Sequence, residues 1–142
     1  MNRDESKTLE QRFPKDLRSL EGVFSFLDRF MKGHDVNAEP AYIMTLAVEE
    51  FFTNIVKYDS HKDGLVSIRA LREPGRIIIQ LSDENSDRFD VTQSNAPRDD
   101  IPLEQRKIGG LGIYLSNQML DDVRYEHVNN TSTITLVKNL ET

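Results

Sequence analysis

The chain has 142 residues, of which 37% are hydrophobic and 30% are charged, and its formal net charge is −6. This balance predicts one soluble globular domain over residues 1–142, and the acidic charge argues against a nucleic-acid binder, which needs a basic face. The chain has no cysteine, which excludes disulfides and thiolate metal sites. No run of residues is apolar enough to span a membrane, so we expect a cytoplasmic protein.

The first part of the chain predicts one strand and two helices. Residues 7–13 alternate weakly and predict an edge strand that ends at Pro14. An amphipathic helix is expected from a cap at Asp16 to about Gly33, because an acidic side chain accepts the free N–H groups of a first turn. Its expected apolar stripe consists of Leu17, Leu20, Val23, Phe24, Leu27, Phe30 and Met31. A second helix is expected over residues 39–58.

The second part predicts two hairpins that are separated by a long loop and a short helix. The expected elements are strands at 65–71 and 76–81, a loop at 82–108, a helix at 112–120, and strands at 123–128 and 133–137. The loop is long for a compact domain, and long loops are usually functional. This order of elements predicts an α+β fold, a two-layer sandwich with helices on one face of a mostly antiparallel sheet.

Glu50 and Asn54 lie four residues apart on the second expected helix, so they stack on one face. A helical wheel places them beside an apolar stripe, where polar groups need partners. That stripe consists of Met44, Val48, Phe51 and Ile55. A carboxylate there can act as a general base, and an amide oxygen can ligate Mg²⁺. A purely structural role also stays open, with Glu50 paired to a basic side chain and Asn54 bonded to a strand backbone.

Two further features point toward a nucleotide. The Gly-Gly-Leu-Gly stretch at 109–112 precedes the short expected helix, and glycines let backbone N–H groups approach an anion closely. Arg106 and Lys107, just before it, can neutralise phosphate charge. Asp83 follows a strand and can accept a hydrogen bond from a nucleotide's exocyclic amine. The alternatives are a flexible hinge at 109–112 and a simple turn at Asp83.

Three stretches together resemble the GHKL-type ATP-binding fold, also called the Bergerat fold. They are residues 46–58, which resemble the family's N-box, residues 108–115 with their continuation at 119–125, which resemble its second glycine box, and the end at 135–140. Within this fold the sequence looks most like the anti-sigma-factor serine/threonine kinases of bacterial partner-switching systems. The resemblance covers nearly the whole chain.

The resemblance implies an ATP-dependent serine/threonine protein kinase that is also an anti-sigma factor. Glu50 would take the proton from an incoming serine hydroxyl, Asn54 would ligate Mg²⁺ between the ATP phosphates, and Asp83 would read the adenine amino group. The implied nucleotide contacts are Asn54, Lys57, Asp83, Asn85, Arg106, Gly109, Gly110, Leu111 and Gly112. The implied partners are a STAS-type anti-sigma-factor antagonist, a sigma factor and a second copy of the chain.

The sequence departs from the family pattern at the first glycine box, where Asn85 and Asp87 replace two glycines. Side chains then stand where backbone should pass close to adenine, and Asp87 adds negative charge near the phosphates. A second interpretation therefore stays open, a catalytically weak or inactive regulator of the same fold that binds nucleotide or partner proteins. A third, a fragment of a sensor histidine kinase or another ATPase of this fold, is disfavoured because we expect the chain to begin in a strand of the domain itself.

Overall fold

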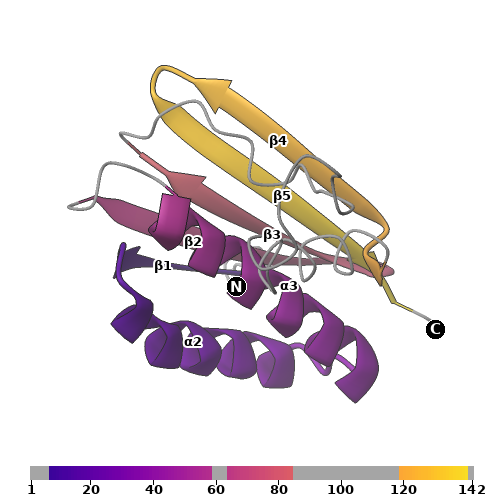
Figure 1. Ribbon diagram of the computed structural model, residues 1–142. Helices are drawn as coiled ribbons and strands as arrows, with labels where there is room; N and C mark the ends of the chain where they lie inside the picture. Colours follow the sequence, from indigo (N-terminus) through magenta and orange to yellow (C-terminus); the bar gives the residue numbers. More distant parts are fainter. Residues whose placement is uncertain (1–6, 59–63, 85–118, 141–142) are drawn as a thin grey trace, which may run out of the picture.

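The computed structural model describes residues 7–58, 64–84 and 119–140. In these ranges two long helices cover one face of a five-stranded antiparallel sheet (Figure 1). The elements are β1 (Thr8–Pro14), η1 (Leu17–Ser19), α2 (Leu20–Gly33), α3 (Ala38–Tyr58), β2 (Leu65–Glu73), β3 (Arg76–Asp83), β4 (Asp122–Val128) and β5 (Thr131–Asn139). The expected α+β two-layer sandwich is confirmed.

The sheet has the strand order β1-β2-β3-β5-β4, and every neighbouring pair is antiparallel. The last residues of β1, β3 and β4 therefore meet the first residues of β2 and β5 at one end of the sheet, which we call the Asp83 end. Directly opposite residues share a face. The row at this end runs through Phe13, Val66, Asp83, Ser132 and His127. Phe13 and Val66 are buried, so the row faces the helices.

Both expected hairpins are confirmed, and their turns follow from residues that tolerate positive φ. Gly75 has φ +81 after Pro74, and Asn129 and Asn130 have φ 51 and 63. The four strands of these hairpins are longer than the sequence predicted. In particular β3 continues through Asp83, so this residue belongs to the strand, whereas the sequence analysis placed it after the strand.

The first expected helix is partly wrong at its start and in its apolar stripe. Asp16 does act as a cap, since its carboxylate accepts the backbone N–H of Arg18 at 2.8 Å, but the capped turn is the 3-10 helix η1. Leu17 and Phe24, assigned to the stripe, are 48% and 37% exposed. Phe26, which the stripe omitted, is fully buried.

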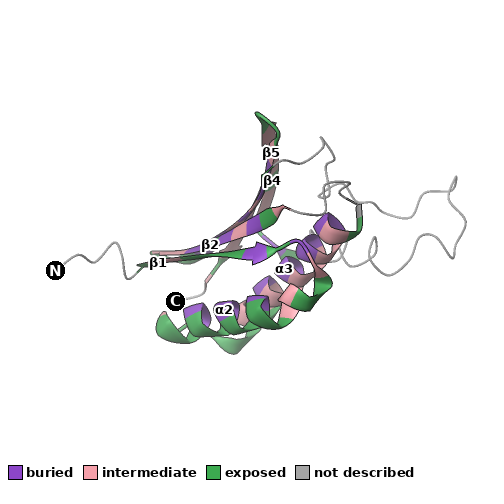
Figure 2. Ribbon diagram, turned by 90° about the vertical axis from the view of Figure 1, so that its left-hand side faces the viewer, coloured by how far each residue is buried: buried purple, intermediate pink, exposed green. Residues whose placement is uncertain are grey.

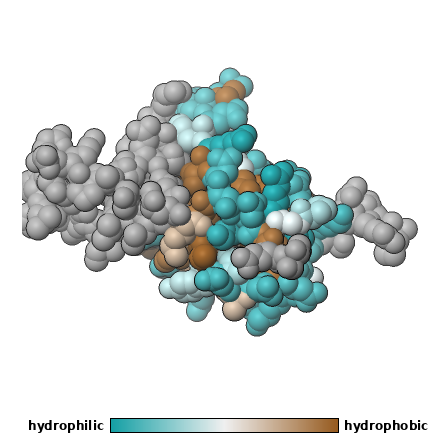
Figure 3. Space-filling model, turned by 90° about the vertical axis from the view of Figure 1, so that its right-hand side faces the viewer, coloured by the Kyte–Doolittle hydropathy of each residue, from teal (hydrophilic) through white to brown (hydrophobic). Residues whose placement is uncertain are grey.

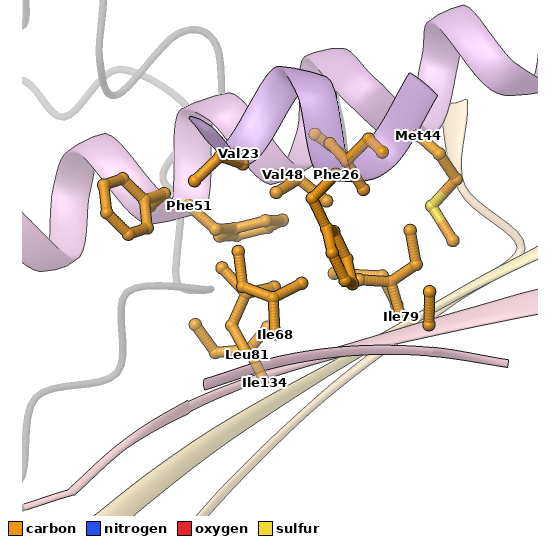
Figure 4. Close-up of a cluster of buried hydrophobic side chains, with 14 of the residues drawn as sticks. Val23, Phe26, Met44, Val48, Phe51, Ile68, Ile79, Leu81 and Ile134 are labelled. Carbon is orange, nitrogen blue, oxygen red and sulfur yellow. The ribbon is translucent and has the colours of Figure 1, made fainter. Parts of the chain in front are cut away.

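The core lies between the helices and the sheet. Figure 4 shows apolar side chains of α2 and α3 pointing toward those of β2, β3 and β5. Figure 2 shows that the buried sides of both helices face the sheet while their outer sides are exposed. The described residues on the face shown in Figure 3 are mostly hydrophilic, with apolar side chains in small patches. Within the described ranges, no helix combines the length and the apolar character that a membrane span needs.

Candidate functional site

Buried polar side chains gather at the Asp83 end of the molecule. Among the described residues they are Lys15, Asn54, Asp83 and Ser132. Asp83 and Ser132 are opposite each other on β3 and β5, and Lys15 follows β1 directly. Figure 1 shows that α3, whose penultimate turn carries Asn54, also ends near the point where β3 ends. Because buried polar groups need specific partners and are otherwise rare in this apolar core, this concentration marks the candidate site.

The pair on α3 is arranged as the sequence predicted. Glu50 is half-buried and Asn54 is 3% exposed. The Asn54 amide nitrogen donates to the backbone carbonyl of Glu50 at 2.6 Å, so the bond runs to the helix's own backbone and not to a strand. This bond uses one N–H of the carboxamide and orients the group. Mg²⁺ prefers oxygen ligands, and the side-chain oxygen is the atom through which an asparagine binds it.

The carboxyl group of Glu50 has a raised pKa. Partial burial is the main cause, the neighbouring carboxylate of Glu49 adds to it, and the charge of Lys57 opposes it. Lys57 lies seven residues further along α3, about two helical turns, and is exposed on the same side of the helix. A carboxylate with a raised pKa accepts a proton more readily, which is what a general base requires.

Asp83 is not an open carboxylate. Its Oδ1 lies 2.7 Å from the Nζ of Lys15, and the two side chains are 4% and 0% exposed. The backbone N–H of Lys15 donates to the carbonyl of Gly64 at 3.2 Å, which continues the β1–β2 pairing by one residue. A Cβ at Gly64 would lie 3.5 Å from the Lys15 Nζ. The lysine side chain therefore passes directly over a residue that has no side chain.

A second polar cluster lies next to Asp83 on β4 and β5. The hydroxyl of Ser132 lies 2.9 Å from Nδ1 of His127 and 3.2 Å from the hydroxyl of Tyr125. Tyr125 is opposite Ile134, a core residue, so its side chain also faces the helices. The Asp83 end thus presents one carboxylate, one ammonium, two hydroxyls and one imidazole on the helix-facing side of the sheet.

Lys15 and Ser132 were not predicted from the sequence. Side chains alternate between the two faces of a strand, so Lys15 shares a face with Phe13, and Ser132 shares a face with Ile134 and Leu136. A polar residue at an alternating core position was the available signal in both cases. It was not recognised because Pro14 marked the end of the expected edge strand and the last strand was expected to begin only at residue 133.

The remaining predicted contacts lie outside the described residues. These are Asn85, Arg106, Gly109, Gly110, Leu111 and Gly112, together with most of the expected loop at 82–108 and of the expected helix at 112–120. No group of three or more His, Cys, Asp or Glu side chains that could hold a metal occurs in the ranges that the structure describes.

Comparison with known proteins supports the resemblance. The family model of the histidine kinase-like ATPase domain matches residues 13–138. The serine-protein kinase RsbW of Listeria monocytogenes is 30% identical over 97 residues, a match that covers 64% of this chain and 61% of that protein. A crystal structure of the RsbU and RsbW domains of a Mycobacterium tuberculosis protein has a TM-score of 0.66 at 15% identity. It covers 94% of this chain and 32% of the other, and it shows the fold alone.

Proposed function

Because the chain belongs to the family of histidine kinase-like ATPase domains, we propose that it is an ATP-dependent serine/threonine protein kinase and anti-sigma factor. Its substrate is a STAS-type antagonist. One observation carries the proposal: α3 holds a half-buried carboxylate with a raised pKa one turn from a buried, oriented carboxamide. The match to a protein named a serine-protein kinase supports the resemblance that the motifs indicated.

The residues of the site fit ATP and Mg²⁺ by their chemistry. Asn54 supplies the oxygen that would hold Mg²⁺, and Lys57 supplies positive charge for the phosphates. Asp83 supplies an acceptor for the base. Bound ATP would supply the γ-phosphoryl group and leave as ADP, and Mg²⁺ would neutralise the charge of the phosphates. Glu50 takes the proton from the serine hydroxyl, so that the hydroxyl oxygen becomes the nucleophile.

The other parts of the proposal come from the same resemblance. Nucleotide contacts are assigned to Asn85, Arg106, Gly109, Gly110, Leu111 and Gly112. The chain acts in the cytoplasm as a single domain, binds a sigma factor in addition to its antagonist, and forms a homodimer.

A second candidate function is a regulator of the same fold that binds partners and hardly turns over nucleotide. The observation that favours it is the replacement of two glycines of the family's first glycine box by Asn85 and Asp87.

Calorimetric titration with Mg-ATP separates these two functions at their first step. The kinase requires binding of Mg-ATP, and Asn54→Ala should weaken binding in the presence of Mg²⁺ much more than in EDTA. Absence of binding at millimolar ATP would overturn the kinase and leave the partner-binding regulator.

Phosphoryl transfer is then measured with radiolabelled ATP and STAS-domain proteins of the same cell. Wild type should label a serine or threonine, and Glu50→Gln should lower the rate by about 10²–10⁴-fold, the usual contribution of a general base. Glu39→Gln is the matched control, since Glu39 is an exposed glutamate in the first turn of the same helix. Equal labelling by wild type and Glu50→Gln would refute the assigned base.

A further inference from the structure

The buried ammonium of Lys15 has no part in the proposed phosphoryl transfer. It lies at the end of the site where Asp83 would meet the nucleotide base, and the two side chains are almost wholly inaccessible. We propose that Lys15 determines the base selectivity of the nucleotide site by keeping Asp83 ionised and therefore an acceptor of hydrogen bonds only. This inference rests on the proposed nucleotide binding, and it names the residue that makes the site select a 6-amino purine.

The geometry ties the two residues together across one intervening strand. Lys15 is held by its backbone bond to Gly64 at the start of β2, and Asp83 is held in the β3 ladder opposite Val66 and Ser132. The lysine side chain reaches over Gly64 to place Nζ 2.7 Å from Oδ1. The sheet therefore fixes the backbone positions of both residues and holds the ammonium beside the carboxylate.

The charge state of Asp83 decides what it recognises. An ionised carboxylate only accepts hydrogen bonds, so it pairs with the 6-amino group of adenine and opposes the 6-oxo group of hypoxanthine or guanine. A buried carboxylate without a cation tends to bind a proton, because burial disfavours the charged form. The protonated group has an O–H donor and accepts a 6-oxo purine as well. An ammonium at 2.7 Å prevents this loss of discrimination.

The other groups facing this row do not replace Lys15. Ser132 contributes a neutral hydroxyl opposite Asp83. His127 is the other titratable side chain on the row, and its Nδ1 contacts the Ser132 hydroxyl at 2.9 Å. The positive charge beside Asp83 is therefore that of Lys15, whose Nζ lies 2.7 Å from Oδ1.

Binding of ATP and of inosine 5′-triphosphate, which differ in the 6-amino and 6-oxo groups, tests the inference. Affinities are measured by titration calorimetry with Mg²⁺ for wild type, Lys15→Met and Asp83→Asn. Wild type should prefer ATP at least about tenfold, the effect of one hydrogen bond to a charged group. Lys15→Met and Asp83→Asn should each bring the ratio of the two affinities close to one. Lys32→Met, which removes an exposed lysine paired with Asp28, should keep the wild-type ratio.

The outcomes separate this inference from the function it rests on. If wild type prefers ATP and a folded Lys15→Met keeps the same ratio, the role of Lys15 is refuted while nucleotide binding stands. If wild type binds neither nucleotide, both are overturned. If Lys15→Met lacks a cooperative thermal transition, Lys15→Gln takes its place, because it removes the charge but keeps a donor for Asp83. The same fall in the ratio is expected, and an unchanged ratio would refute the inference.

Discussion

Removing one partner of the Lys15–Asp83 ion pair should destabilise the fold much more than removing both. Nζ and Oδ1 are 2.7 Å apart, and the side chains are 0% and 4% exposed. At that distance an effective dielectric constant of about 20 gives a direct attraction of roughly 6 kcal/mol, most of which offsets the desolvation of two charges. Lys15→Met removes the attraction and leaves the desolvated carboxylate, so we expect the free energy of unfolding to fall by roughly 3–5 kcal/mol.

Urea denaturation and thermal melting measure this loss. A change of that size should lower the Tm by roughly 10 °C or more in a chain of this length. The double variant Lys15→Met/Asp83→Asn leaves no buried charge from the pair, so it should be more stable than Lys15→Met alone. Lys32→Met is the matched control. Its partner Asp28 lies 3.1 Å away, but the two side chains are 78% and 61% exposed, so the change should stay within about 0.5 kcal/mol.

One result of these stability measurements would refute an interaction between Lys15 and Asp83. If the losses from Lys15→Met and Asp83→Asn simply add in the double variant, the two charges do not interact in the folded protein. The same result would also remove the physical basis for assigning base selectivity to Lys15.

Two further predictions concern α3. Glu50→Gln should raise the free energy of unfolding near neutral pH: burial raises the folded-state pKa of Glu50, so its ionisation opposes folding as the pH rises through that value. Urea midpoints over a pH series should show the gain vanish below the ordinary pKa of a glutamate, and a gain that grows toward acid would contradict the sign. Phe51→Ala should lower the free energy of unfolding by roughly 3–5 kcal/mol in urea denaturation, because the ring is fully buried; a loss under about 1 kcal/mol would mean that the ring is not packed in the core.

The sequence predicted the elements well where apolar periodicity or turn chemistry was strong. Both hairpins were found because Gly75 and the Asn129-Asn130 pair mark their turns. The ends of the strands were not found. For example, β5 begins with Thr131 and Ser132, which carry no apolar alternation and join the strand by pairing with its neighbours. Backbone ladders extend strands through polar residues that pattern analysis leaves out.

The apolar stripe of α2 shows a limit of a different kind. Phe24 stands four residues after Leu20, and Phe26 stands three after Val23, so helical spacing admits both. Packing against the sheet decides between them, and it buries Phe26 edge-on against Phe13, with ring centroids 5.9 Å apart. That contact is between β1 and α2. The spacing of residues within one helix does not define how these two elements lie relative to each other.

The candidate site, too, was predicted only in part. Glu50 and Asn54 were placed correctly because four residues on a helix fix a shared face, whatever the rest of the fold does. Asp83 was identified, but its partner was not. Lys15 and Asp83 are far apart in the sequence, and the pairing of β1 with β2 and of β2 with β3 brings them together.

The buried ion pair also bears on why the Asp83 end differs from the rest of the core. Elsewhere the space between helices and sheet is filled by apolar side chains. Replacing a buried ion pair by apolar residues of similar size is often neutral or stabilising, so the pair is weak evidence for a role in stability. It does supply a carboxylate of fixed charge and position, which an apolar pair would not. Its place at the end of the sheet where α3 brings Asn54 therefore favours a role in recognition over one in folding.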